Sequence, residues 1–152
     1  MRLVVQRVAQ AAVHTGEELL GQIERGAVVL VGIAPADDPA VVDAMARKLV
    51  DLRYFEDAEG RTNLDIGGVN GAYLVVSQFT LLANLRRGRR PGFGEAAAPA
   101  IAAPLVDRFV GRLRDAGHRV AVGSFGASMR LELVNEGPFT LVIDSERDLR
   151  TG

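Results

Sequence analysis

The sequence predicts a mixed α+β domain rather than a doubly wound sheet. Three observations lead to this prediction. The chain begins with β-branched segments up to residue 33, two stretches at 38–53 and 99–115 have apolar residues three or four apart, and strand-like patterns return afterwards. The length of 152 residues and an apolar content of 48% fit one domain with an ordinary core.

The N-terminal segment predicts a meander of short strands. Apolar and polar residues alternate over residues 3–8, residues 12–14 form a second short segment, and Thr15-Gly16 makes a turn into residues 18–24. The next run, AVVLVGI at 27–33, is uniformly apolar, which is typical of a strand covered on both faces.

The first helix is predicted to begin at Asp38-Pro39, an acidic cap followed by proline in the first turn, and to end near Arg53. We attribute Asp37 as well as Asp38 to capping. The segment YFEDAEG at 54–60 predicts a short strand that runs into a turn. The glycine-rich segment IGGVNG at 66–71 predicts a turn-rich connection rather than an element.

The second half begins with a buried strand at 73–79, followed by the second helix at 99–115, with Gly117 where a helix-ending residue is expected. Further strands are predicted at 119–122, 129–134 and 139–143, with a turn at Asn135–Pro138 between the last two. We therefore expect a single domain over residues 1–144. The polar tail, residues 145–152, is expected to fray.

Composition excludes several classes of protein. Lys plus Arg number 18 against 19 for Asp plus Glu, so the chain lacks the overall positive field of a general DNA or RNA binder, and any anion site must be local. It has no cysteine, no signal-peptide core and no apolar run long enough for a membrane span, which predicts a cytoplasmic protein without a membrane partner. No nucleotide-binding glycine motif and no metal-ligand spacing occur, so we expect neither cofactor nor metal.

Conventional acid–base catalysts are scarce in this sequence. His14 and His118 have no partner motif nearby, so we interpret both as structural and do not expect a Ser-His-Asp triad. Among the carboxylates, Asp57 and Glu59 are explained by a turn and Asp65 stands alone.

Two polar groups remain, and each has two interpretations. Ser77, Gln78, Phe79 and Thr80 either satisfy local backbone groups at a strand end or present N–H and hydroxyl donors to a substrate carbonyl. The arginines that follow either form a solvated loop or bind phosphate, which would offset their mutual repulsion. These arginines are Arg86, Arg87, Arg89 and Arg90.

The motifs SQFTL at 77–81 and NEGPFT at 135–140 resemble the two signature motifs of the D-aminoacyl-tRNA deacylase family. The opening LVVQRV, the segment LRYFEDAEGRTNLD and the loop ending RPGF extend the resemblance over nearly the whole chain to about Asp144. It implies a compact, barrel-like α/β domain that works as a homodimer. The implied activity is hydrolysis of the ester bond of D-aminoacyl-tRNA, and also of glycyl-tRNA, without a cofactor.

The resemblance also implies roles for individual residues. The motif containing Asn135 carries a cis Gly137-Pro138 bond that reaches into the pocket of the partner subunit and excludes L-side chains. Residues 77–80 form the other wall of the pocket, and Arg7 holds the Gly-Pro loop in place. The arginine loop contacts phosphates near the acceptor end of the tRNA.

Alternatives remain at this point. The chain could be a non-catalytic, dimeric RNA-binding module, because conventional catalytic side chains are lacking. It could also be a related deacylase with relaxed chirality, against which the intact SQFTL motif argues. Thr80 could act as a nucleophile, but no adjacent base is in view, so we interpret it as a supporting residue.

Overall fold

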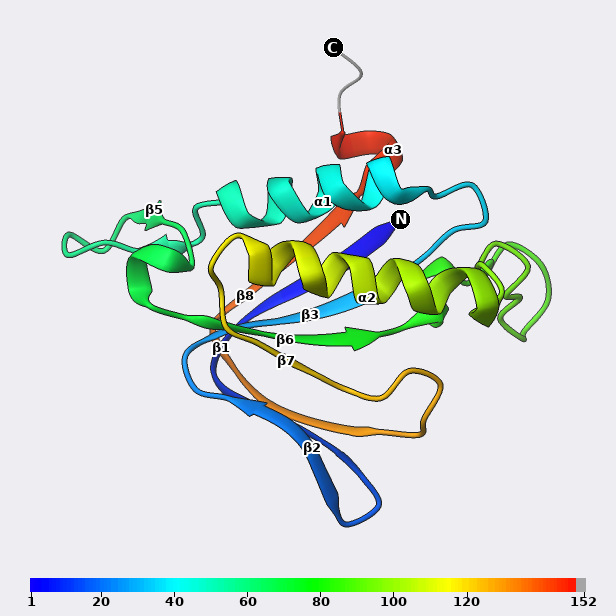
Figure 1. The fold of residues 1–152 in the computed structure, drawn as a ribbon, viewed down its shortest axis with the longest axis horizontal. Coiled ribbons are helices and arrows are strands. Elements are labelled where there is room, and N and C mark those ends of the chain that lie inside the picture. Colours follow the sequence, from blue (N-terminus) through cyan, green and yellow to red (C-terminus); the bar gives the residue numbers. More distant parts are fainter. Residues whose placement is uncertain (150–152) are drawn as a thin grey trace.

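The computed structural model describes residues 1–149, in which a strongly curved β-sheet carries two long helices on one face (Figure 1). Strand β1 (Arg2–Thr15) is the centre of this sheet. One edge of β1 pairs with β8 (Arg130–Asp144). On the other edge, residues 2–8 pair with β3 (Gly26–Gly32) and residues 11–15 pair with β2 (Glu18–Ile23). The predicted N-terminal meander is therefore one long hairpin, in which β2 and β3 run back along β1.

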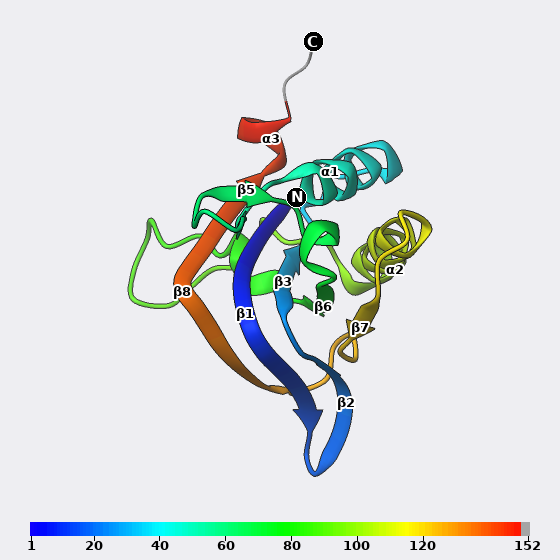
Figure 2. The ribbon, with the colours of Figure 1, turned by 90° about the vertical axis from the view of Figure 1, so that its left-hand side faces the viewer.

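The far side of the sheet is parallel. Strand β6 (Ala72–Ser77) pairs with β3, and β7 (Val120–Val122) pairs with β6. The sheet curls until β2 approaches β7, where a Cβ on Gly21 would lie only 3.0 Å from the carbonyl oxygen of Val122. The absence of a side chain at Gly21 thus lets the two edges nearly meet, giving the expected barrel-like sheet (Figure 2).

Both predicted helices are present. Helix α1 (Pro39–Asp51) begins after Asp38, whose carboxylate accepts a hydrogen bond from the Val41 N–H at 2.9 Å. Helix α2 (Pro99–Asp115) ends just before Gly117, which has a φ of +90°. No helix within residues 1–149 is long and apolar enough to cross a membrane.

The sheet is buried on both faces. Val29 and Val31 of β3 pack in the core beneath the helices, whereas Val28 packs in a second core with Leu74 and Val76. The curled halves of β1, β2 and β8 cover this second core. Residues 27–33 were predicted to be covered on both faces, and the alternation of β3 between two cores confirms it.

Short elements complete the chain. Strands β4 (Phe55–Glu56) and β5 (Thr62–Leu64) form a small separate ladder, and a single 3₁₀ turn, η1 (Gly67–Val69), lies in the predicted connection. Helix α3 (Ser145–Asp148) follows β8 directly. The predicted frayed tail is therefore wrong for residues 145–148, and the predicted end of that tail, residues 150–152, lies outside the described residues.

Two further predictions need correction. Asp37 does not cap α1, because its carboxylate accepts hydrogen bonds from the α-ammonium group of Met1 at 2.7 Å and from the Ala34 N–H at 2.6 Å. The predicted strands at 129–134 and 139–143 are one strand, β8. The predicted turn between them is an outward bulge within that strand.

Candidate functional site

The chain turns sharply where β6 ends at Ser77. Gln78 donates its N–H to the carbonyl of Val31 at 2.7 Å, and the 3₁₀-helix η2 (Phe79–Leu82) begins at the next residue. The first N–H groups of a helix have no intrahelical acceptor. The N–H groups of Phe79 and Thr80 are therefore available as donors at this corner.

Helix η2 lies directly against the end of β3 because Gly32 has no side chain. A Cβ at Gly32 would lie 3.1 Å from the Cβ of Leu81 and 3.2 Å from the carbonyl oxygen of Gln78. Both distances are tighter than ordinary contacts. Gly32 therefore fixes how closely the corner approaches the sheet.

A pocket of about 600 Å³ opens beside this corner. Ser77, Gln78 and Phe79 line one side, and the beginning of α2 lines another. Phe79 is 56% exposed and meets Phe93 edge-on, with 5.0 Å between the ring centroids. The volume lies within the range of small-ligand sites, and the walls are mostly apolar with a few polar groups at one edge, as such sites usually are.

Sequence reasoning missed part of this pocket. Phe125 and Met129, from the loop between β7 and β8, also line it. A large apolar residue within the glycine- and serine-containing stretch GSFGAS was the available signal for Phe125, whereas Met129 carried none. A larger groove of about 1100 Å³ on the curled side of the sheet contacts none of the predicted site residues.

The hydroxyl of Thr80 lacks the partner that a nucleophile requires. The side-chain amide of Gln78 donates a hydrogen bond to it. Within residues 1–149, no histidine or carboxylate forms a hydrogen bond with this hydroxyl. Because threonine needs an adjacent base to attack an ester, the geometry favours a supporting role for Thr80.

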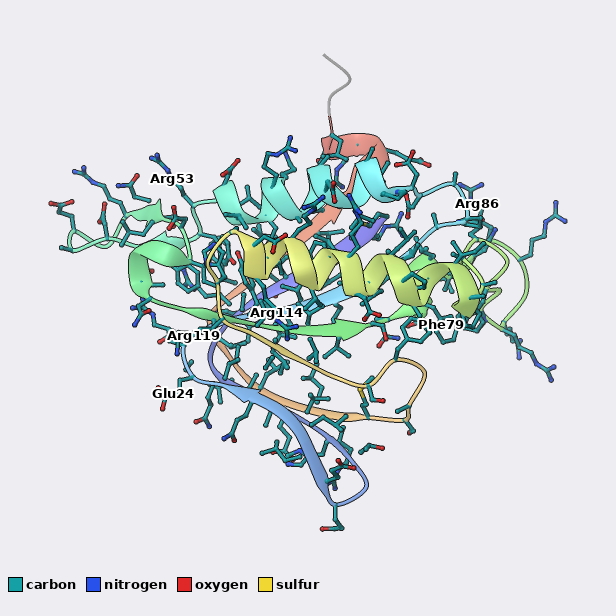
Figure 3. The ribbon with its side chains drawn as sticks, viewed as in Figure 1. Glu24, Arg53, Phe79, Arg86, Arg114 and Arg119 are labelled. Atoms are coloured by element: carbon teal, nitrogen blue, oxygen red, sulfur yellow. The ribbon has the colours of Figure 1, made fainter. Side chains whose placement is uncertain are left out.

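The arginine loop lies at the same end of the molecule as the pocket. Figure 3 shows Phe79 and Arg86 at this end. The loop is closed by a pair of backbone hydrogen bonds between Asn84 and Gly92, at 2.7 and 2.9 Å, and the Asn84 side chain accepts the Arg86 N–H at 2.9 Å. All four predicted arginines are exposed, and none forms an ion pair within the described part of the chain.

The second motif forms the bulge in β8. The residues 136–139 stand opposite Arg7 alone, because Gln6 pairs with Thr140 and Val8 with Asn135. The Gly137-Pro138 peptide is cis, and both residues are exposed. Asn135 closes the bulge: its side chain accepts the Phe139 N–H at 2.9 Å and donates to the Thr140 hydroxyl at 3.1 Å.

Arg7 supports this bulge from beneath. Its side chain is buried at 7% exposure, and it donates to the carbonyls of Glu136 at 3.0 Å and Tyr54 at 2.8 Å. The guanidinium carbon also lies 4.6 Å from the centroid of the Phe139 ring. A buried arginine with two carbonyl acceptors is costly to displace, so Arg7 fixes the bulge firmly.

The two motifs do not meet within one chain. Ser77 pairs with Val31 near one end of β3, whereas Arg7, beneath the bulge, pairs with Ala27 near the other end. Strands β3 and β1 separate β6 from β8. Strand geometry then separates the motifs by about 13 Å along the strands and about 14 Å across the sheet.

Among residues 1–149, no titratable group with a displaced pKa lines the pocket. Hydrogen bonds from Arg108 and then Arg112 hold the pKa of Asp43 well below its usual range, on the outer faces of the helices. Burial raises the pKa of the Tyr54 and Tyr73 hydroxyls within the core. The pocket therefore offers backbone donors, a hydroxyl and apolar walls rather than a tuned acid or base.

The fold and the site define an α/β domain with a mostly apolar pocket that carries backbone donors at one edge, beside an exposed cationic loop. Curated relatives named D-aminoacyl-tRNA deacylase match almost end to end: one from Roseiflexus sp. (strain RS-1) is 53% identical and covers 95% of this chain and 94% of its own. Another, from Symbiobacterium thermophilum, is 53% identical with 97% of both chains covered. A solved structure named c-Myc DNA Unwinding Element Binding Protein is 35% identical with a TM-score of 0.89, and covers 95% of this chain and 98% of that chain.

The sequence profile of the D-Tyr-tRNA(Tyr) deacylase family matches residues 4–144. The chain belongs to this family. The resemblance inferred from the two motifs is therefore confirmed for the family, and the barrel-like mixed fold that it implied is confirmed as well.

Proposed function

We propose that this protein hydrolyses the ester bond of D-aminoacyl-tRNA and releases free D-amino acid and tRNA. As a member of its family it is a hydrolase that acts on ester bonds. The observation that carries the proposal is the corner at residues 77–80, of which Ser77, Gln78 and Phe79 line a pocket of about 600 Å³ and Thr80 follows directly. Because its substrate is made in the cytoplasm, we propose that the protein works there.

Backbone donors suit this reaction. An aminoacyl ester is already activated, and the neighbouring 2′-hydroxyl of the terminal ribose can assist, so hydrolysis needs positioning and oxyanion stabilisation more than a strong base. The N–H groups of Phe79 and Thr80 would stabilise the oxyanion. One such donor contributes roughly 2.7–4 kcal/mol to lowering the barrier. A water molecule attacks the carbonyl carbon, and the terminal ribose oxygen leaves with a proton.

The chiral filter would come from a second copy of the chain. The separation of the two motifs within one chain supports this arrangement, because Gly137 and Pro138 are exposed and cannot reach the pocket beside Ser77 of the same subunit. In a homodimer, the bulge of one subunit would enter the pocket of the other. Its backbone carbonyls would admit D-side chains and the achiral glycyl ester and exclude L-side chains.

The arginine loop would hold the phosphates near the acceptor end. Its four exposed guanidinium groups have no carboxylate partners within the described residues. Arg86, at the start of the loop, lies at the same end of the molecule as Phe79 (Figure 3). Arginine suits bidentate phosphate binding. The ester and the nucleic-acid chain would thus be bound by neighbouring segments.

A turnover assay tests the proposal. Purified protein is incubated separately with labelled D-tyrosyl-tRNA and L-tyrosyl-tRNA, and loss of the label is followed against buffer alone. Rapid loss of the D-ester alone is expected. Loss of both esters would contradict the Gly137-Pro138 filter while keeping the hydrolase, and loss of neither would contradict the hydrolase.

The second candidate is a nucleic-acid-binding module without turnover. The exposed arginine loop favours it, and a structure 35% identical carries the name of a DNA-element-binding protein. This candidate predicts that uncharged tRNA is bound as tightly as D-aminoacyl-tRNA and that neither ester is hydrolysed. Filter binding beside the turnover assay separates the two candidates.

A further inference from the structure

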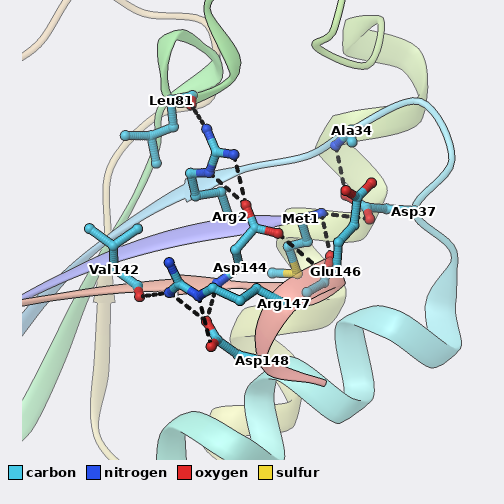
Figure 4. Close-up of polar contacts among 11 residues, drawn as sticks. Met1, Arg2, Ala34, Asp37, Leu81, Val142, Asp144, Glu146, Arg147 and Asp148 are labelled. Carbon is cyan, nitrogen blue, oxygen red and sulfur yellow. Dashed lines mark hydrogen bonds and ion pairs between the residues drawn. The ribbon is translucent and has the colours of Figure 1, made fainter. Parts of the chain in front are cut away.

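Arg2 joins the corner helix to the last strand of the sheet. Its Nη1 donates to the carbonyl of Leu81 in η2 at 2.8 Å, while its Nε and Nη2 contact Oδ2 of Asp144 at 2.8 and 2.7 Å (Figure 4). Leu81 directly follows Thr80. One guanidinium group therefore ties the carbonyl end of η2 to the end of β8.

Both partners of this contact are held in place. The backbone of Arg2 pairs with Gly32 on one side and with Asp144 on the other. The other carboxylate oxygen of Asp144 accepts the Glu146 N–H at 3.1 Å, and its backbone N–H donates to Asp148 at 2.8 Å. Because a guanidinium is planar with fixed donor directions, the orientation set by Asp144 directs Nη1 towards η2.

Helix η2 has few other restraints. It is a four-residue 3₁₀-helix in which only Leu82 is buried, and Phe79 and Thr80 are exposed. Short 3₁₀-helices have weak internal hydrogen-bond geometry. The side chains of Phe79 and Thr80 make exposed contacts with Phe93 and with the Gln78 amide. The backbone of η2 is held by the Gln78 N–H bond at its beginning, the contact with Gly32 and the Arg2 bond near its end.

We propose that Arg2 is a positioning residue that sets, through the Leu81 carbonyl, the location of the N–H donors of Phe79 and Thr80, with Asp144 orienting its guanidinium. The catalytic part of this inference rests on the proposed function. Oxyanion donors act at about 2.7–3.1 Å from the developing charge, and a displacement of about 1 Å can lower the rate about 100-fold.

Arg147 provides a matched control. It likewise binds an aspartate, Asp148, and a backbone carbonyl, that of Val142, at 2.7 Å each, but it does not contact η2 (Figure 4). Arg2→Met and Arg147→Met each remove a partly exposed ion pair together with a carbonyl contact. Their thermal midpoints should therefore fall by similar small amounts, and only the first should disturb η2.

The kinetic test measures kcat and KM with D-tyrosyl-tRNA and with D-tyrosyl-adenosine. Arg2→Met should lower kcat between about 10- and 100-fold on both substrates, with KM changed by less than about threefold, because the defect lies at the ester. Asp144→Asn should show a smaller loss of the same kind. Arg2→Lys, which keeps a cation near the carbonyl, should recover part of kcat. Arg147→Met removes a contact to Asp148, which holds Asp144 from its far side, so it should lower kcat less than about threefold.

A second measurement does not require turnover. The N–H groups of Leu81 and Ala83 donate to the carbonyls of Gln78 and Thr80, at 3.2 and 3.1 Å, and so close the two ends of η2. Their hydrogen exchange should quicken in Arg2→Met and Asp144→Asn but not in Arg147→Met. If exchange is faster in the two variants but the wild-type protein does not hydrolyse the ester, the proposed function is wrong and the positioning of η2 by Arg2 still stands. Unchanged exchange, or a rise in KM at constant kcat, would overturn the role of Arg2, and Arg2→Lys and Asp144→Asn decide the matter if Arg2→Met does not fold.

Discussion

At Gly137, a methyl group would lie 2.7 Å from Nη2 of Arg7, and the φ of +127° belongs to a region that L side chains rarely adopt. Gly137→Ala must therefore displace the guanidinium and the bulge that it holds. We expect kcat/KM on D-tyrosyl-tRNA to fall more than about 10-fold, whereas Ser77→Ala should lower it less than about threefold. Equal activity of Gly137→Ala and wild type, with both folded by circular dichroism, would remove the bulge from the mechanism.

Some residue roles could not be read from the sequence. Asp37 and Asp38 have the same chemistry at neighbouring positions, yet only Asp38 caps α1, because the folded chain brings the Met1 ammonium group beside Asp37. The positions of Phe125 and Met129 in the pocket likewise depend on a loop from another part of the chain. The order of residues along the chain predicts a role such as helix capping, whereas the roles of Asp37, Phe125 and Met129 depend on contacts with distant parts of the chain. The residues of the two motifs were identified by their resemblance to a family, and their catalytic roles remain predictions.

At the scale of elements, Asp43 joins the two long helices. It lies on α1 and accepts two hydrogen bonds each from Arg108, both at 2.7 Å, and Arg112, at 2.9 and 3.0 Å, on α2. These bonds lower the pKa of Asp43 below its ordinary value of 3.8. A carboxylate whose pKa is lowered by folding stabilises the protein above its ordinary pKa, and this stabilisation is lost as the pH falls through the lowered value.

Asp43→Asn should therefore lower the free energy of unfolding at neutral pH. The difference from wild type should stay constant down to about pH 5 and shrink below about pH 4, where the wild-type carboxylate begins to lose its advantage. Urea unfolding at several pH values measures this difference. Asp57→Asn is the control for general acid effects, because the Asp57 carboxylate accepts only the backbone N–H groups of Glu59 and Arg61 and pairs with no guanidinium group among the described residues. A difference independent of pH would show that the helix contact is not electrostatic.

The arginine loop is predicted to act on the phosphates of the tRNA and not on the ester. Arg86→Glu should raise KM for D-tyrosyl-tRNA and reduce the slope of log KM against log salt by about 0.7–0.9 for each phosphate that the loop no longer neutralises. KM for D-tyrosyl-adenosine should not change, because that substrate lacks the tRNA phosphates. Arg47→Glu, an equal charge change at an exposed position of α1, is the control. Equal effects of both variants on KM and on its salt dependence would show that the loop is a solvated surface segment that does not bind tRNA phosphates.

The elements that were predicted well are those whose pattern is local. Residues 99–115 gave the second helix with its bounds, and Asp38-Pro39 gave the start of the first. Strands β1 and β8 were each divided in two, because bulges interrupt their alternation near Val8 and at residues 136–139. Their continuity follows from pairing between the two ends of the chain, which periodicity within either segment does not reveal.

At the scale of the whole molecule, the proposed two-chain site makes a prediction about mixed dimers. Phe79→Pro removes one N–H donor at a position where proline is tolerated, since Gln78 before it is not helical (φ −148°, ψ 84°). Phe79→Pro and Gly137→Ala should each be nearly inactive. A dimer of one Phe79→Pro chain and one Gly137→Ala chain has one wholly unaltered site, so it should recover about half of wild-type activity.

Such mixed dimers can be purified by co-expressing the two variants with different affinity tags. Each variant paired with itself, carrying the same tags, serves as the control. No recovery in the mixed dimer, or a wild-type protein that sediments as a monomer while fully active, would contradict a site shared between two chains. Either result would require the bulge to act outside the pocket.

The pairing of β1 with β8 joins Arg2 to Asp144, so one edge of β1 stays unpaired until β8 is available. During synthesis, β1 can form its hairpin with β2 and β3 early, but its other edge has no partner until β8 has left the ribosome. Contacts so distant in sequence slow folding, and an unpaired edge is the part of an unfinished chain most prone to join another molecule. The order of synthesis therefore makes the strand that carries the Gly137 bulge the last to be added.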